Sequence, residues 1–135
     1  MSKAVEIKME ALKKRLIRMR KNLNNGSPIM RKTAILMDKD VIDHFEKEKG
    51  PRSRWASTAR GGKKLQDKGR LRLSIRPRST KDQAIVGTNM VYAATHNYGD
   101  SSRNIKKRKF LWLSREIKEK IKKNMGQYFI GDKVV

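Results

Sequence analysis

The stretch from residue 91 to residue 114 constrains the fold of this chain more than any other. It begins with a small apolar run, Val91 to Ala94, crosses a polar and basic loop from Asp100 to Lys107, and returns to apolar residues at Phe110 to Leu113. In a chain that is only 36% hydrophobic, this last cluster predicts core and not surface. The rest of the chain must supply helices and strands that pack against both ends. Five large side chains are predicted as core anchors: Trp55, Tyr92, Phe110, Leu111 and Trp112.

The charge of the chain limits its partners. Lys and Arg number 35 against 13 Asp and Glu in 135 residues, a net charge of +22. Such an excess strains a compact monomer and attracts polyanions, so nucleic acid, an anionic membrane face or an acidic protein can supply the counter-charge. The length predicts one domain, residues 1–135, with one modest core. No cysteine is present, no apolar run approaches the length of a membrane span, and we expect no signal peptide.

The N-terminal segment predicts an amphipathic helix from a cap at Ser2 to about Asn24. Its apolar residues recur at steps of four and three: Val5, Met9, Leu12, Leu16, Met19 and Leu23. Basic residues occupy the other faces. Three interpretations stay open at this point: a surface helix packed on its own domain, an interface helix that pairs with another subunit, and a membrane-surface helix, although Trp and Phe anchors are absent from the apolar side.

A second helix is predicted from Pro28 to Lys49, after a break at 24–28. Gly26 suits the left-handed position that ends a helix, and Ser27 can cap the next one. The short connection predicts that the two helices form an antiparallel hairpin over residues 1–49. Residues 26–49 carry five basic and five acidic residues, whereas the flanking segments are strongly basic, so we expect the neutral helix to be enclosed by the others.

Residues 50–69 are predicted to form a basic loop. Its one large apolar residue, Trp55, is interpreted either as an anchor of the loop on the core or as a stacking platform for a base or a partner side chain. Five cations crowd this loop and are the candidate contacts for a polyanion: Arg52, Arg54, Arg60, Lys63 and Lys64.

Residues 70–113 predict a small antiparallel sheet. Leu71, Leu73 and Ile75 alternate with polar residues, which favours a strand, and a helical turn after Gly69 stays open. We expect a second strand at 84–88 and a third at 110–113. Ser114 then caps a C-terminal helix over 114–130. The predicted fold class is α+β, with the N-terminal hairpin and the C-terminal helix packed on the sheet.

Catalytic and metal-binding patterns are missing from the sequence. It has two histidines, no nucleophile elbow and no phosphate-binding glycine motif, so we expect no enzyme activity, cofactor, metal or small-molecule substrate. His44 is predicted to be solvated on a helix flank, and His96 and Tyr98 to hydrogen-bond within a turn that ends at Gly99. The predicted assembly surfaces are instead the segment 50–64 and the loop 97–107. The candidate residues of the loop 97–107 are Tyr98, Asp100, Arg103, Lys106 and Lys107.

A set of residues in fixed order extends from about residue 40 to about residue 125. The set is Trp55; Leu65, Gly69, Leu71, Ser74 and Ile75; Val86 and Gly87; Tyr92, Ala93, His96 and Gly99; Arg108, Phe110 and Leu111. Taken together they resemble the tailed-phage virion morphogenesis family, the tail-completion proteins of Mu-like phages. Two positions depart from the family pattern: Lys109 stands where the family usually has Pro, and Lys68 where Thr often precedes the Gly.

The resemblance implies a structural protein of the head–tail junction of the virion, which completes a tail or joins it to a capsid. It implies self-association as a ring and contacts with neck, tail and portal-side proteins, with assembly in the cytoplasm of a bacterial host. The alternative, motivated by charge alone, is a sequence-independent nucleic-acid-binding protein. No helix-turn-helix, zinc-finger or ribonucleoprotein signature supports that alternative. The two roles can coexist, because DNA passes through the neck of a phage.

Overall fold

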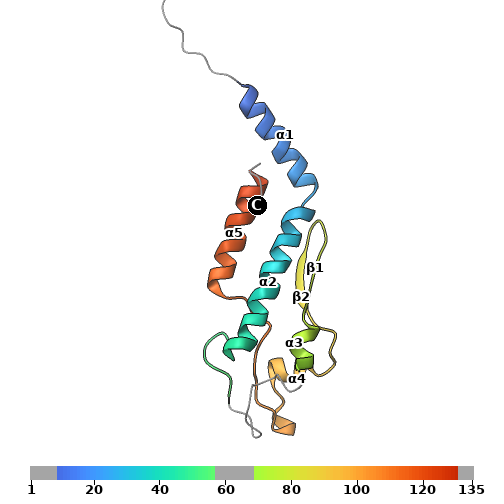
Figure 1. Ribbon diagram of the computed structural model, residues 1–135, viewed down its shortest axis with the longest axis vertical. Coiled ribbons are helices and arrows are strands. Elements are labelled where there is room, and N and C mark those ends of the chain that lie inside the picture. The colour runs from blue at the N-terminus through green and yellow to red at the C-terminus, as the bar shows by residue number, and fades with distance from the viewer. Residues whose placement is uncertain (1–8, 57–68, 131–135) are drawn as a thin grey trace, which may run out of the picture.

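The computed structural model describes residues 9–56 and 69–130. Its long central helix, α2, has helix α5 on one side and a β-hairpin on the other, while α1 extends beyond this body (Figure 1). The elements are α1 (Glu10–Asn24), α2 (Ser27–Lys47), α3 (Arg70–Ser74), β1 (Arg76–Ser79), β2 (Ala84–Gly87), α4 (Ala93–Tyr98), the 3-10 helix η2 (Ser101–Arg103) and α5 (Arg115–Phe129). The predicted α+β class is confirmed.

Helix α2 is the enclosed helix, as its balanced charge predicted. It contacts β1, β2 and α5, and its buried residues are Ile29, Met30, Thr33, Ala34, Asp40, Val41, His44 and Phe45. The larger core cluster lies at its C-terminal half and consists of Val41, Phe45, Trp55, Leu71, Ile75, Ala93 and Phe110. A smaller cluster at its N-terminal half joins Ile29 and Met30 to Tyr128 of α5. Among the described helices, none has the length and apolar character needed to cross a membrane.

The predicted antiparallel hairpin of the first two helices is wrong. Gly26 has φ −84° and ψ 1°, close to helical values, so the chain bends between α1 and α2 without reversing direction (Figure 1). The glycine is required by close approach, because a Cβ at this position would lie 2.3 Å from the carbonyl oxygen of Lys81. Ser27 is the first residue of α2 and not its cap, and its N–H donates to Asn25 Oδ1 at 3.1 Å. Ser2 lies outside the described residues.

The predicted strand over 71–75 is also wrong, and the helical alternative holds. Residues Arg70–Ser74 form the short helix α3, which starts after Gly69 at φ +65°. Leu71 and Ile75 lie four residues apart on one face and are each 3% exposed, whereas Leu73 is 67% exposed. The strand begins only at Arg76 and pairs antiparallel with β2, which matches the predicted second strand.

The third strand predicted at 110–113 is wrong: this segment is irregular and lies outside the sheet, with a bend at Leu111 where the N–H of Trp112 donates to the carbonyl oxygen of Phe110 at 3.1 Å. Within the described residues the sheet has two strands, β1 and β2. The backbone N–H groups of Phe110 and Leu111 both donate to Asn97 Oδ1 at 3.0 Å. Because one buried side chain satisfies both donors, this segment needs no neighbouring strand. Ser114 then caps α5, as predicted, and its side chain accepts from the N–H of Ile117.

The last turn of α5 is joined to α1 by three hydrogen bonds. Tyr128 Oη donates to the carbonyl oxygen of Asn25 at 2.5 Å, and Asn22 Nδ2 donates to the carbonyl oxygen of Tyr128 at 2.7 Å. Arg15 Nε donates to the carbonyl oxygen of Ile130 at 2.9 Å. These polar contacts hold α1 against α5, yet no residue of α1 is buried.

Candidate functional site

Two loops that the sequence singles out separately meet in the structure. We call them together the loop end, residues 49–56 and 98–109. Residues 49–56 follow α2, and residues 98–109 follow α4 and include η2. Both lie at the end of the molecule opposite α1 (Figure 1). The candidate site is built from this pair of loops.

The first loop is fixed to the core by Trp55. Glu48 ends α2 in the left-handed conformation, at φ 51°, and turns the chain. The N–H of Trp55 then donates to the carbonyl oxygen of Glu48 at 2.8 Å. Its ring is buried and packs edge-on against Phe45 at a centroid distance of 5.6 Å, and its Nε1 donates to the carbonyl oxygen of Lys109 at 3.0 Å. The ring is therefore engaged by the core and is not a stacking surface for a base.

The second loop is ordered by Gly99 and Asp100. Helix α4 ends at Gly99 with φ +78°, and a Cβ there would lie 2.9 Å from the backbone N of Lys107. Asp100 and Ile105 exchange two backbone hydrogen bonds of 2.8 Å. Hydrogen bonds from Ser102 and Arg103 lower the pKa of Asp100 to about 2, so this carboxylate stays ionised and holds the loop closed at neutral pH.

Arg108 ties the two loops together. It is buried, its N–H donates to the carbonyl oxygen of His96 at 2.8 Å, and its Nε donates to the carbonyl oxygen of Ala56 at 3.0 Å. Sequence reasoning placed Arg108 in the family motif but gave it no role. The sequence does contain a signal for this role: Arg108 lies two residues before the apolar Phe110, so an arginine is expected at the edge of the core.

The two loops of the loop end line an open, basic pocket of about 550 Å³, which we call the basic hollow. Its lining residues are Gly50, Pro51, Arg52, Ser53, Arg54, Trp55, Lys107 and Lys109, so half of them are cations and none is acidic. The structure thus brings together Arg52 and Arg54 of the predicted polyanion set with Lys107 of the predicted assembly loop. The other three candidates of the polyanion set, Arg60, Lys63 and Lys64, lie outside the described residues.

The candidate residues of the assembly loop, apart from the half-buried Asp100, are exposed on the same loop that contributes Lys107 to this hollow. Tyr98 is 68% exposed, and Arg103, Lys106 and Lys107 are exposed as well. Arg103 is held in place by Asp100 Oδ2 at 2.6 Å and by Thr95 Oγ1 at 3.2 Å. Tyr98 and the exposed cations of this ordered loop form a contact surface. The tyrosine ring contributes apolar area to this surface at a low cost in conformational entropy.

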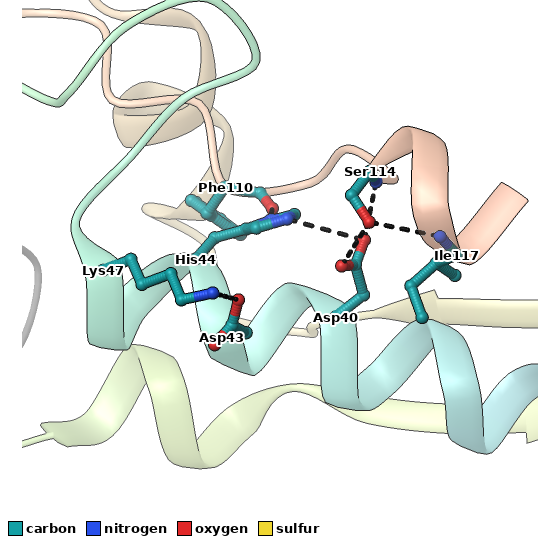
Figure 2. A network of polar contacts seen from close by, with 7 residues as sticks. All are labelled: Asp40, Asp43, His44, Lys47, Phe110, Ser114 and Ile117. Atoms are coloured by element: carbon teal, nitrogen blue, oxygen red, sulfur yellow. Dashed lines mark hydrogen bonds and ion pairs between the residues drawn. The ribbon is translucent and has the colours of Figure 1, made fainter.

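A buried polar network holds the chain that leads away from this site (Figure 2). Asp40 of α2 accepts from the N–H and the Oγ of Ser114 at 2.7 and 2.8 Å. His44, one turn further along α2, donates from Nδ1 to the carbonyl oxygen of Phe110 at 3.0 Å, and its Nε2 lies 3.5 Å from Asp40 Oδ2. Its ring stacks on Trp112, with centroids 3.7 Å apart. Residues 110–114 are thereby fixed along α2.

The prediction that His44 is solvated is therefore wrong, because its side chain is completely buried. Burial lowers the pKa of His44 below its ordinary value, more than the nearby carboxylates raise it. Its spacing of four from Asp40 places both residues on one helical face with Val41 and Phe45, and this spacing was the signal in the sequence. A surface ion pair lies nearby on α2, where Lys47 Nζ is 3.0 Å from Asp43 Oδ2.

The predicted core anchors have different surroundings. Trp55 and Phe110 are buried in the larger cluster, Leu111 is half-buried against it, and Trp112 is half-buried on His44. Tyr92 is 36% exposed and lies edge-on to the His96 ring at 5.8 Å, so its prediction as a core anchor is wrong. Tyr92 precedes the first residue of α4, and it is the next residue, Ala93, that faces the core.

The polar network has the geometry of a cap and not of a nucleophile. Ser114 Oγ donates to Asp40 and accepts from the N–H of Ile117, while the His44 ring donates to a backbone carbonyl. The serine hydroxyl is therefore bonded to Asp40 and to the helix terminus, and the His44 imidazole is directed to a backbone carbonyl and not to the serine. Nowhere in residues 9–56 and 69–130 do three His, Asp or Glu side chains gather in a way that suits a metal ion.

Comparisons with known proteins agree with the resemblance noted in the sequence. A model of the phage virion morphogenesis family matches residues 7–129. The chain is 34% identical over 109 residues to the Mu-like prophage FluMu G protein 2 of Haemophilus influenzae, a match that covers 76% of this chain and 78% of that protein. No solved structure matches the chain.

Proposed function

This chain belongs to the phage virion morphogenesis family, and from that premise we propose that it completes the tail or joins it to the head at the neck of the virion. Membership supports the coarser statement directly: the protein is a phage assembly protein that interacts with other virion proteins. In the finer proposal it acts as a single domain, in the host cytoplasm during assembly and then at the head–tail junction. It works by self-association and by contacts with neck, tail and portal-side proteins.

The loop end is the observation that carries this proposal. Its two loops are cross-tied by Trp55 and Arg108, so their exposed residues hold a fixed arrangement before any partner binds. Preorganised loops lose less entropy on binding than flexible ones, which suits a protein that must dock once and permanently. The exposed Tyr98 supplies the aromatic area expected of an interface hot spot.

The test is a set of loop-end variants in a phage or prophage that depends on this gene. Tyr98→Ala combined with Lys106→Glu and Lys107→Glu should leave the melting temperature of the purified protein unchanged, because these exposed side chains contribute little to stability. It should reduce infectious particles strongly and leave heads and tails unjoined or unfinished in electron micrographs. The matched control, Lys120→Glu with Lys123→Glu on the exposed side of α5, changes charge equally and should have little effect. Normal particles from the loop-end variant would refute the assigned surface.

Self-association is tested separately. Light scattering on the purified protein and electron microscopy of virion necks should show a symmetric ring in the assembled particle, even where the free protein is a monomer. A closed ring uses one heterologous interface repeated around an axis. A single copy in the neck would rule out the ring without affecting the assignment to assembly.

The basic hollow favours a second candidate function, sequence-independent contact with DNA. Its lining of four cations with no acid suits phosphate groups. We expect log affinity for duplex DNA to fall steeply with log salt, by about 0.9 per neutralised phosphate, with no sequence preference. Replacing the five cations of the polyanion set with Ser should flatten this slope. If that variant loses DNA binding but still assembles infectious particles, the DNA contact is incidental; tight, salt-resistant binding to one sequence would instead overturn the assembly role.

A further inference from the structure

Helix α1 presents an apolar stripe that residues 9–56 and 69–130 leave largely exposed. We call it the α1 stripe: Met9, which precedes the helix, and Leu12, Leu16, Met19 and Leu23 within it. The steps between these residues are three, four, three and four, the spacing of a coiled-coil seam. Leu16 is 52% exposed and Leu23 is 66% exposed. Figure 1 shows α1 extending away from the body of the molecule.

The contacts of α1 with α5 lie beside the stripe and not on it. Arg15 and Asn22 make the hydrogen bonds to the end of α5. On a helix of 3.6 residues per turn, both lie on one flank of the stripe. These hydrogen bonds do not involve the stripe, of which Met9, Leu12, Leu16 and Leu23 are exposed and Met19 is half-buried.

Charge decides what can cover the stripe. The positions that flank a coiled-coil seam set the choice of partner. In α1 the cations Lys13, Arg15 and Arg20 occupy these positions, together with the neutral Asn22. A helix with the same flanks would be repelled, whereas a helix with Glu or Asp at its flanks would pair both its apolar seam and its charges with α1.

We propose that the α1 stripe is the docking site for an acidic amphipathic helix of a different protein. The inference rests on the proposed assembly role only in expecting that this protein is another component of the virion. The C-terminal end of α5 is bonded to Arg15 and Asn22 on one flank of the α1 stripe. The docked helix therefore approaches the stripe from the other flank.

The described helices of the chain do not provide such a partner helix. Five of the nine exposed residues of α5 are Lys or Arg and two are Glu, so its exposed face is basic on balance, and the acidic residues of α2 lie on a helix whose apolar face is already buried. A membrane surface is the other occupant that fits a basic amphipathic helix. Stable interfacial helices are anchored by Trp or Phe on the apolar side, and residues 10–24 contain neither.

The test uses a synthetic acidic peptide of about three heptads, with Leu at the seam and Glu at the flanks. We expect it to bind the full-length protein in a fluorescence anisotropy titration. Leu12→Ser with Leu16→Ser should weaken binding at least about tenfold, because two buried leucines are lost. Ile17→Ser is the matched control, since Ile17 is 69% exposed on α1 but lies off the stripe, and it should bind normally.

Charge is tested by a second matched pair. Lys13→Glu with Arg20→Glu reverses the flanks, and should abolish binding of the acidic peptide and create binding of the same peptide with Lys at its flanks. Lys14→Glu with Lys21→Glu makes the same change of net charge on the opposite side of the helix, and should retain binding of the acidic peptide. If both charge variants weaken binding equally, or if the unmodified protein does not bind the acidic peptide, the proposal is overturned.

Two further measurements identify a different occupant. An oligomer in light scattering that dissociates in Leu12→Ser with Leu16→Ser would assign the stripe to a second copy of the chain. Binding to phosphatidylglycerol vesicles that the same variant loses, without binding of the acidic peptide, would assign it to a membrane. Either result overturns the acidic-helix proposal.

Particle yield separates this proposal from the assembly role. Normal particle yield from Leu12→Ser with Leu16→Ser would overturn the acidic-helix proposal and leave the assembly role intact. Normal tailed particles after deletion of the gene would refute the assembly role alone.

Discussion

Phe110 gives the sharpest test of the core. Its side chain is completely buried in the larger cluster, with its ring 5.2 Å from that of Phe45. Phe110→Ala removes the transfer free energy of a buried aromatic side chain, adds the energetic penalty of a cavity, and deletes an aromatic pair. The backbone bonds of residue 110 to Asn97 and His44 remain available. We therefore expect a loss of about 3–5 kcal/mol in the free energy of unfolding, the range measured for such truncations.

This loss is large against a total stability of about 5–15 kcal/mol. For a chain of this length, about 3 °C of melting temperature per kcal/mol predicts a decrease of about 10–15 °C. Circular dichroism melts and urea titrations measure both quantities. Leu73→Ala is the control: Leu73 belongs to the apolar alternation of residues 71–75 that predicted a strand, but it is 67% exposed, so its substitution should change stability by less than about 0.5 kcal/mol.

The comparison of these two variants decides between two arrangements of the chain. If Phe110→Ala melts like the unmodified protein, residue 110 does not close the core and the site geometry derived from it is wrong. If Leu73→Ala is as destabilising as Phe110→Ala, residues 70–76 form the alternating strand that the sequence favoured, and α3 is incorrect.

Three further predictions concern the polar network and two glycines. Ser114→Ala should decrease the stability to urea by about 1–2 kcal/mol, since it removes the cap of α5 and a partner of Asp40. Burial lowers the pKa of His44, so the unfolded chain protonates first as the pH falls below about 6.5 and stability should decrease there, with a flatter pH profile in His44→Gln. In thermal melts Gly26→Ala should be destabilising because of the Lys81 carbonyl, whereas Gly126→Ala, with open space around it, should stabilise α5 by about 1 kcal/mol.

The sequence predicts those elements whose signals are local. The break at residues 24–28, the balanced charge of residues 26–49 and the serine before α5 are each recognised within one turn or one helix length, and the structure has both helices and the Ser114 cap. The hairpin strand β2 also follows from its own composition. Local signals suffice here because the propensity, the periodicity and the capping residue of each segment favour the same conformation.

The errors arise where contacts between distant segments decide the outcome. Residues 71–75 satisfy a period of two and also a spacing of four, and only the core beside Phe45 selects the helix. The burial of His44 depends on Trp112 and Phe110, which are more than sixty residues away in the chain. The bend at Gly26 depends on the carbonyl of Lys81 in the hairpin turn. No window of sequence around any of these residues contains its partner.

The two proposed contact surfaces lie at opposite ends of α2, and this separation has a consequence for assembly. Helix α2 has 21 residues, which at 1.5 Å per residue places the loop end and the C-terminal end of α1 about 30 Å apart. Sites this far apart with no shared side chains contribute independently. A variant altered at both Tyr98 and Leu16 should therefore show the sum of the two binding defects. A combined defect larger than the sum would mean that one partner contacts both surfaces. The protein would then bind along a single neighbouring protein and would not connect two different ones.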